Sequence, residues 1–155
     1  MTQMPLFQPP SEWTPPEKVP DLSEAKEIAI DLETCDPNIK TIGPGWPRGD
    51  GYIAGIAIAV DGWKGYFPIR HEGGGNFDEK IVKRQVKKIM ELPCDKIFHN
   101  ASYDVGWLRW WGVEIKGKII DTLIAAPLID ENRFRYSLNE LGKDYLKDTK
   151  SEALL

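Results

Sequence analysis

Short apolar runs alternate with glycine- and proline-rich segments in the first half of the chain, a pattern typical of strands and turns. Residues 26–32 (KEIAIDL) predict a strand of period two, with apolar even positions and partly acidic odd positions. After a predicted loop at 34–51, the runs 52–60 and 63–69 are joined by an Asp-Gly dipeptide and predict a β-hairpin. Pro68 has no N–H to donate, so the second arm is expected at the edge of the sheet.

The second half of the chain alternates between helical and strand patterns. Asp78 is placed to cap a helix, and Ser137 with Glu140 forms the capping box of another. In order, the elements expected are a helix after Asp78, a strand at 96–98, a helix at 102–111, a strand at 118–120, a helix at 122–130 and a helix from 137 to about 146. The helix after Asp78 carries an apolar stripe, made of Ile81, Val82, Val86, Ile89 and Met90.

This order of elements predicts an α/β fold with one mixed sheet. Three hairpin-linked antiparallel strands come first, βα units follow, and helices flank the sheet. The 155 residues suit one domain. Six of the twelve prolines fall within residues 1–23, which predicts a proline-rich leader before a domain at 24–155. A leader lying on the surface is favoured over an arm that docks a partner.

Composition and charge exclude several classes of protein. No apolar run approaches the roughly 20 residues of a membrane span, so no membrane partner is expected. Cys35 and Cys94 provide neither a disulfide framework nor metal-ligand spacing, which is typical of a reduced, cytoplasmic protein. The net charge of −4 argues against gripping nucleic acid through bulk basicity. Contact with phosphate through metal ions held by carboxylates stays open.

Three carboxylates are expected to meet at strand ends. Asp31 and Glu33 share one face of the first strand, about 6.6 Å apart at Cα. Asp104 lies on the apolar face of the helix at 102–111, where an acidic group is costly unless it is paired or metal-bound. The alternatives are that Asp31 and Glu33 face water at a loop start, and that Asp104 only favours the helix N-terminus. As oxygen ligands, the three predict Mg²⁺ or Mn²⁺ and a two-metal phosphoryl displacement.

Two segments resemble motifs of a known superfamily. Residues 30–34 (IDLET) resemble the first motif of the 3′–5′ exonucleases that carry three Asp and one Glu, and 99–104 (HNASYD) resemble the second. The chain is most similar to the proofreading exonuclease domain of family A, polymerase I-like, DNA polymerases, which has a ribonuclease-H-like (DnaQ-like) fold. The likeness runs through the hairpin and through Ile120-Asp121-Thr122, and it covers about residues 26–147.

The resemblance implies a role for each matching residue. Asp31 would bridge two divalent cations, Mg²⁺ or Mn²⁺; Glu33 would hold the first and help to activate water; Asp104 would hold the second. The residues expected against the terminal nucleotide are Thr34, Asn100 and Tyr103. The implied partners are the single-stranded 3′ end of DNA, with RNA not excluded, and the polymerase domain of a longer bacterial or phage-encoded chain.

The family's third motif, Tyr-x-x-x-Asp, has no full match. Tyr136 and Glu140 imitate it with the wrong acid, and a capping box explains Glu140 without chemistry. The motif is expected beyond residue 155, so the chain is interpreted as truncated and the isolated chain as weakly active or inactive. His99 and Asp104 also fit a motif of the histidine branch of the superfamily, but their early place in the chain favours the second motif.

Three other side chains are given structural interpretations. His99 is expected as a strand-end residue rather than a general base. His71 has no partner spacing and is expected in solvent. Trp46, in the predicted loop, is interpreted as packing on its own stem rather than stacking on a base.

Two other functions are weighed against a proofreading exonuclease. A ribonuclease-H-like domain that binds nucleic acid without turnover would suit the missing third motif. A stand-alone RNA-trimming 3′–5′ exonuclease would use the same metal site, because that site reads neither base nor sugar.

Overall fold

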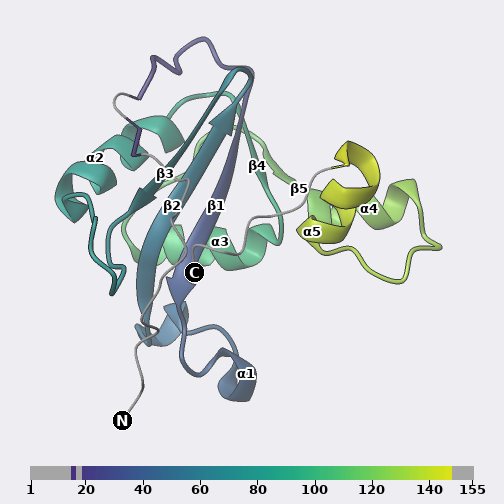
Figure 1. Cartoon of the computed structure of the whole chain (residues 1–155), viewed down its shortest axis with the longest axis horizontal. Coiled ribbons are helices and arrows are strands. Elements are labelled where there is room, and N and C mark those ends of the chain that lie inside the picture. Colours follow the sequence, from purple (N-terminus) through teal and green to yellow (C-terminus); the bar gives the residue numbers. More distant parts are fainter. Residues whose placement is uncertain (1–14, 17–18, 148–155) are drawn as a thin grey trace.

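The computed structural model describes residues 15–16 and 19–147 (Figure 1). Five strands form one sheet in the order β3-β2-β1-β4-β5. The strands are β1 (Glu27–Cys35), β2 (Tyr52–Val60), β3 (Trp63–Pro68), β4 (Asp95–Phe98) and β5 (Ile119–Asp121). The helical elements are α1 (Ile39–Ile42), η1 (Trp46–Arg48), α2 (Glu79–Met90), α3 (Ala101–Trp110), α4 (Thr122–Ile129), α5 (Leu138–Leu141) and η2 (Gly142–Leu146).

The sheet is mixed, as the sequence predicts. Strand β1 pairs antiparallel with β2, and β2 pairs antiparallel with β3. Strands β4 and β5 run parallel, β4 beside β1 and β5 beside β4. The proline-containing arm β3 is an edge strand, where a missing N–H breaks no ladder bond.

Strand β1 is longer than the sequence predicts. It continues to Cys35, so the expected loop at 34–51 begins later and contains α1 and η1. The pairing shifts at a β-bulge between Glu33 and Thr34, where the partners change from Gly55 to Ile53, so the extra residue of the bulge is Ala54 of β2 and β1 continues to pair beyond it.

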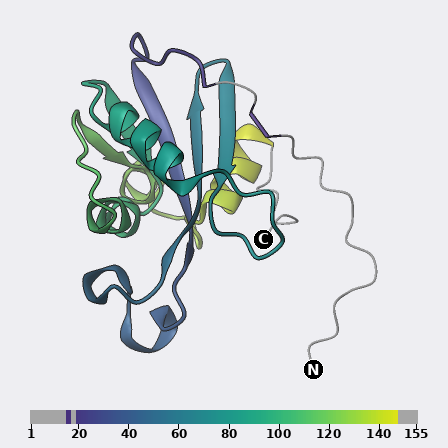
Figure 2. The same ribbon diagram turned by 90° about the vertical axis from the view of Figure 1, so that its left-hand side faces the viewer.

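Helices α2 and α3 cover one face of the sheet (Figure 2). Apolar side chains from both helices share a core with the even positions of β1, among them Val86, Leu108 and the fully buried Ile28. The Asp78 side chain accepts a hydrogen bond of 3.0 Å from the Ile81 amide and caps α2 as expected. The expected apolar stripe of α2 is wrong at Ile81, which is 57% exposed, because that residue lies one step off the buried row.

The described end of the expected leader contributes to this core. Leu22 is buried, and Val19 packs against the core cluster. Residues 1–14 and 17–18 of the leader, and residues 148–155, lie outside the described residues. None of the helices described is long and apolar enough to cross a membrane.

A buried lysine fastens the start of β4. Lys96 is fully buried, and its Nζ donates to three backbone carbonyls. The acceptors are Leu92 at 2.7 Å, Cys94 at 2.8 Å and Lys116 at 2.9 Å. A buried cation needs such partners, and here each of its three hydrogens has one.

Candidate functional site

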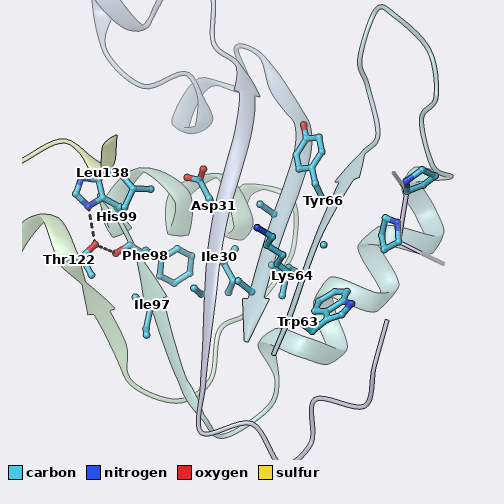
Figure 3. A pocket seen from close by; sticks show the side chains of 17 residues that line it. Ile30, Asp31, Trp63, Lys64, Tyr66, Ile97, Phe98, His99, Thr122 and Leu138 are labelled. Atoms are coloured by element: carbon cyan, nitrogen blue, oxygen red, sulfur yellow. Dashed lines mark hydrogen bonds between the residues drawn. The ribbon is translucent and has the colours of Figure 1, made fainter. Parts of the chain in front are cut away.

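The site lies where β1, β4 and β5 end. The face of the sheet opposite α2 and α3 carries a groove of about 1150 Å³. Figure 3 shows Asp31 on β1 and Tyr66 on β3 lining this groove, with His99 at the end of β4 on its other side. Small side chains such as Ala57 and Ala59 also line it, which leaves the acidic and aromatic groups prominent.

The sequence-predicted acids are brought within electrostatic range of one another. Asp104 on α3 is 4% exposed. Burial above all, together with the negative charges of Asp31, Asp121 and Glu33, raises the pKa of the Asp104 carboxyl to about 7, although a hydrogen bond from the Leu32 backbone opposes the rise. Burial and like charges both disfavour the ionised form of a carboxyl, so the position of Asp104 is unfavourable for its charged form.

The donor set suits a hard divalent cation in chemistry and in charge. Carboxylate oxygens are the ligands that Mg²⁺ and Mn²⁺ prefer. Within residues 15–16 and 19–147, however, no three His, Cys, Asp or Glu side chains are grouped so that they could hold a metal ion. The acids therefore suit a cation by the chemistry of their oxygens and by their negative charge. Their side chains are nevertheless not arranged as a set of ligands in this structure.

Thr34 and Tyr103 connect the end of β1 to α3. The Thr34 hydroxyl and the Tyr103 hydroxyl are hydrogen-bonded at 2.8 Å. The Tyr103 hydroxyl also donates to Asp36 Oδ2 at 3.0 Å, and that oxygen accepts from the Gly45 amide at 2.9 Å. Two of the three residues expected at the terminal nucleotide are thus joined directly.

Asn100, the third of these residues, is exposed at the turn from β4 to α3. Its φ of 74° lies in the left-handed region, which asparagine tolerates better than most residues. The side chain of Asp121 holds this turn. Its Oδ1 accepts from the Asn100 amide at 2.9 Å, and its Oδ2 accepts from the Ala101 amide at 2.8 Å.

Asp121 also caps α4, where Oδ1 accepts from the Leu123 amide at 2.9 Å. One carboxylate therefore satisfies amides at the start of two helices. Asp121 is a functional residue that the sequence motifs alone do not single out. Its signal was present, since an aspartate directly before a predicted helix is a typical N-cap.

His99 is held as a strand-end residue. The Thr122 hydroxyl donates to the Phe98 carbonyl at 3.1 Å, and His99 Nδ1 lies 2.9 Å from the same hydroxyl oxygen. Because the hydroxyl has one hydrogen, His99 Nδ1 donates to it. This structural engagement agrees with the expectation for His99.

The expectation for His71 is wrong. Its Nε2 is hydrogen-bonded to the Tyr66 hydroxyl at 2.5 Å, and the two rings meet edge to face at 5.8 Å. Spacing rules missed the pair because the chain turns back after β3 and brings His71 beside Tyr66. Burial, together with the charges of Glu33 and Asp31, raises the pKa of Tyr66 to about 12.

Trp46 packs on α3 rather than on its own stem. A Cβ built on Gly106 would come within 2.3 Å of the Trp46 ring, so only glycine fits beneath it. Base stacking by Trp46 is therefore not supported, since the indole is already used in packing.

Ser137 caps α5 as expected, which is the half of the capping box that involves the Glu140 backbone. The Ser137 hydroxyl accepts from the Glu140 amide at 3.3 Å, and the Tyr136 hydroxyl donates to the Asp130 carbonyl at 2.7 Å. The likeness of Tyr136 and Glu140 to the third motif is explained by local structure.

Comparison with known proteins adds independent findings. Residues 15–153 match the family model of a 3′–5′ exonuclease found in A-type DNA polymerases. A DNA-directed DNA polymerase of Pseudomonas phage M6 is 37% identical over 165 residues, which cover 98% of this chain and 25% of that protein. DNA polymerase DpoZ of Salmonella phage PMBT28 is 33% identical, over 84% of this chain and 19% of that protein. The chain thus spans about a quarter or less of these relatives.

Among solved structures, Brucella melitensis NrnC with bound Mg²⁺ superposes with a TM-score of 0.58. The match is 24% identical and covers 86% of this chain and 61% of that one. It supports the ribonuclease-H-like fold.

Proposed function

Because the chain belongs to the 3′–5′ exonuclease family of A-type DNA polymerases, we propose that Asp31, Glu33 and Asp104 form its catalytic acidic site and bind divalent cations. The electrostatic coupling of the buried Asp104 to Asp31 and Glu33 carries this proposal. Oxygen ligands favour Mg²⁺ or Mn²⁺. Two such ions, when bound, stabilise charge on the attacking and leaving oxygens of a phosphodiester hydrolysis.

The chain's own residues divide the remaining work. Asp31 and Glu33 stand on one face of β1, where Asp31 lines the groove, while Asp104 approaches from α3. Thr34 and Tyr103, joined by their hydroxyls, present a fixed polar edge to the terminal nucleotide. The exposed Asn100, held in place by Asp121, offers an amide to the same nucleotide. Fixing these groups in advance reduces the entropy cost of binding a flexible strand.

The proposed substrate is the single-stranded 3′ end of DNA. The relatives in which this segment occurs are named as DNA polymerases of phages, which favours DNA over RNA and a polymerase domain as partner in a bacterial or phage-infected cytoplasm. Trimming a 3′ end beside a polymerase is proofreading.

An Asp31→Asn variant of the complete natural protein tests the proposal. We expect hydrolysis of a 5′-labelled single-stranded DNA in Mg²⁺ to fall by at least about 100-fold, because an amide cannot supply the charge that a cation requires. The exposed Glu114→Gln serves as the control and keeps full activity. Unchanged activity in Asp31→Asn would contradict the proposed catalytic site. Faster cleavage of an RNA of the same sequence would contradict the proposal that DNA is the substrate.

A further inference from the structure

The pair Tyr66 and His71 is not used by the proposed function, yet strand register places it beside the acids. Asp31 pairs with Ala57 across β1 and β2, and Ala57 pairs with Tyr66 across β2 and β3. Directly paired residues of a sheet point to the same face. Tyr66 therefore shares a face with Asp31, as Figure 3 shows.

Gly55 lets the Tyr66 side chain reach into the row of Glu33. Glu33 pairs with Gly55, one row further along the sheet. A Cβ at Gly55 would lie 2.1 Å from the Tyr66 hydroxyl oxygen and 2.5 Å from Cζ. The phenol thus lies over the one residue of β2 that pairs with Glu33, and any side chain there would displace it.

His71 fixes the hydroxyl at this position. Its Nε2 lies 2.5 Å from the Tyr66 oxygen. His71 is itself held by Asn76, whose Oδ1 accepts from the His71 amide at 2.7 Å and whose Nδ2 donates to the His71 carbonyl at 2.9 Å. The position of the phenol oxygen is therefore set by a chain of hydrogen bonds as well as by packing.

The chemistry of the phenol indicates how it acts. A tyrosine hydroxyl has an ordinary pKa of about 10 and therefore keeps its proton at neutral pH. A group with so high a pKa is a poor base for removing a proton from water. With the His71 tautomer whose Nε2 carries the hydrogen, His71 donates to the phenol oxygen, and the single phenol hydrogen is left to stabilise and orient a neighbouring carboxylate.

We propose that Tyr66, held by His71, is a positioning residue that orients the Glu33 carboxylate for its part in activating water. The proposal rests on the function proposed for Glu33. It adds a residue from the hairpin to a site otherwise built from β1 and α3.

Kinetics of Tyr66→Phe in the complete natural protein test this role. The phenyl ring keeps its place over Gly55, and only the hydroxyl is lost. We expect kcat on single-stranded DNA to fall about 10- to 100-fold, the cost of losing a hydrogen bond to a charged group. KM is expected to change less than about twofold, since ground-state binding is unaffected. Tyr145→Phe, at a tyrosine 55% exposed on η2, is the matched control and leaves kcat unchanged.

Variants of His71 separate positioning from packing. His71→Gln retains an N–H donor and is expected to keep kcat within about threefold of the natural protein, whereas His71→Leu lowers it as Tyr66→Phe does. Because the two residues act as one unit, Tyr66→Phe combined with His71→Leu is expected to be no slower than either alone.

Each other outcome overturns a defined claim. If Tyr66→Phe has the same kcat as the natural protein while Asp31→Asn is inactive, the role proposed for Tyr66 is overturned and the proposed function stands. A fall in kcat that comes with an equal rise in KM and a lower Tm assigns Tyr66 to packing and also overturns it. Full activity in Asp31→Asn overturns the proposed function itself.

Discussion

Asp104 is the residue whose surroundings oppose its ordinary chemistry most strongly. It is a carboxylate at 4% exposure among other acids, and its pKa is raised to about 7. Cation binding would explain why an acid is buried at this position, because a bound cation stabilises the ionised form that burial disfavours. If position 104 had a purely structural role, an asparagine would be more favourable there than an aspartate, because its amide carries no charge to bury.

The raised pKa gives Asp104 a signature in the stability of the cation-free chain. The folded state holds the proton up to about pH 7, whereas an unfolded aspartate releases it near pH 4. The free energy of unfolding is therefore expected to fall as pH rises from 4 to 7, by as much as about 4 kcal/mol. Asp104→Asn lacks this slope, so it should be markedly more stable than the natural chain at pH 8 and similar at pH 4.

Urea unfolding in the presence of a chelator measures this difference at both pH values. Asp61→Asn, which changes an exposed turn acid between β2 and β3, is the control and should follow the natural chain. Parallel pH profiles for Asp104→Asn and the natural chain would contradict the raised pKa.

At the level of elements, Asp121 joins two helices to the sheet. Its carboxylate ends β5 and accepts from amides at the starts of α3 and α4. Because α3 carries Asp104 and Tyr103, the orientation of these side chains depends on a cap in another strand. A change at Asp121 is therefore expected to disturb the site, both through the turn at Asn100 and through the charge beside Asp104.

Asp121→Ala is expected to lower the free energy of unfolding by about 2 kcal/mol or more, since it removes caps from two helices and each is worth roughly 1 kcal/mol. Asp78→Ala, which removes the cap of α2 alone, is the matched control and should cost about half as much. Urea unfolding at pH 5, where Asp104 keeps its proton, avoids a contribution from charge repulsion. Equal losses in the two variants would show that Asp121 caps a single helix.

Local patterns predicted most of these elements because each depends on neighbours in sequence. The alternation in residues 26–32 gave β1, its buried even positions and the shared face of Asp31 and Glu33. The Asp-Gly turn gave the hairpin, and Ser137 gave a helix cap. The ribonuclease-H-like sheet is confirmed; the roles of the site residues stay predictions.

The features that could not be predicted from the sequence depend on strand register and on where the chain reverses direction. The bulge after Glu33 and the reach of Tyr66 over Gly55 follow from which residues of three strands lie opposite one another. A shift of one residue would turn these side chains to the other face, and no local pattern encodes that choice. The partner of His71 was missed for the same reason.

For the molecule as a whole, the proposed site predicts a link between cation binding and stability. An ion that binds only the folded state adds about 2.7 kcal/mol when its concentration is 100 times its Kd. For a chain of this size, that corresponds to a rise in Tm of roughly 5–10 °C. We expect such a rise with Mn²⁺ at pH 8, which is above the raised pKa of Asp104.

Thermal unfolding followed by circular dichroism measures this shift, with Asp31→Asn as the comparison. The variant should show a much smaller rise, because it loses a charged ligand of the proposed site. A rise of equal size in both proteins would mean that Mn²⁺ binds elsewhere.

Lys96 has a consequence for how this domain tolerates change. Its Nζ donates one hydrogen to each of three backbone carbonyl oxygens that are arranged around it. The flat guanidinium of arginine spreads its donors across a plane and is bulkier, so it cannot serve the same three acceptors. Lys96→Arg, although it keeps the positive charge, is therefore expected to be among the most destabilising substitutions in β4.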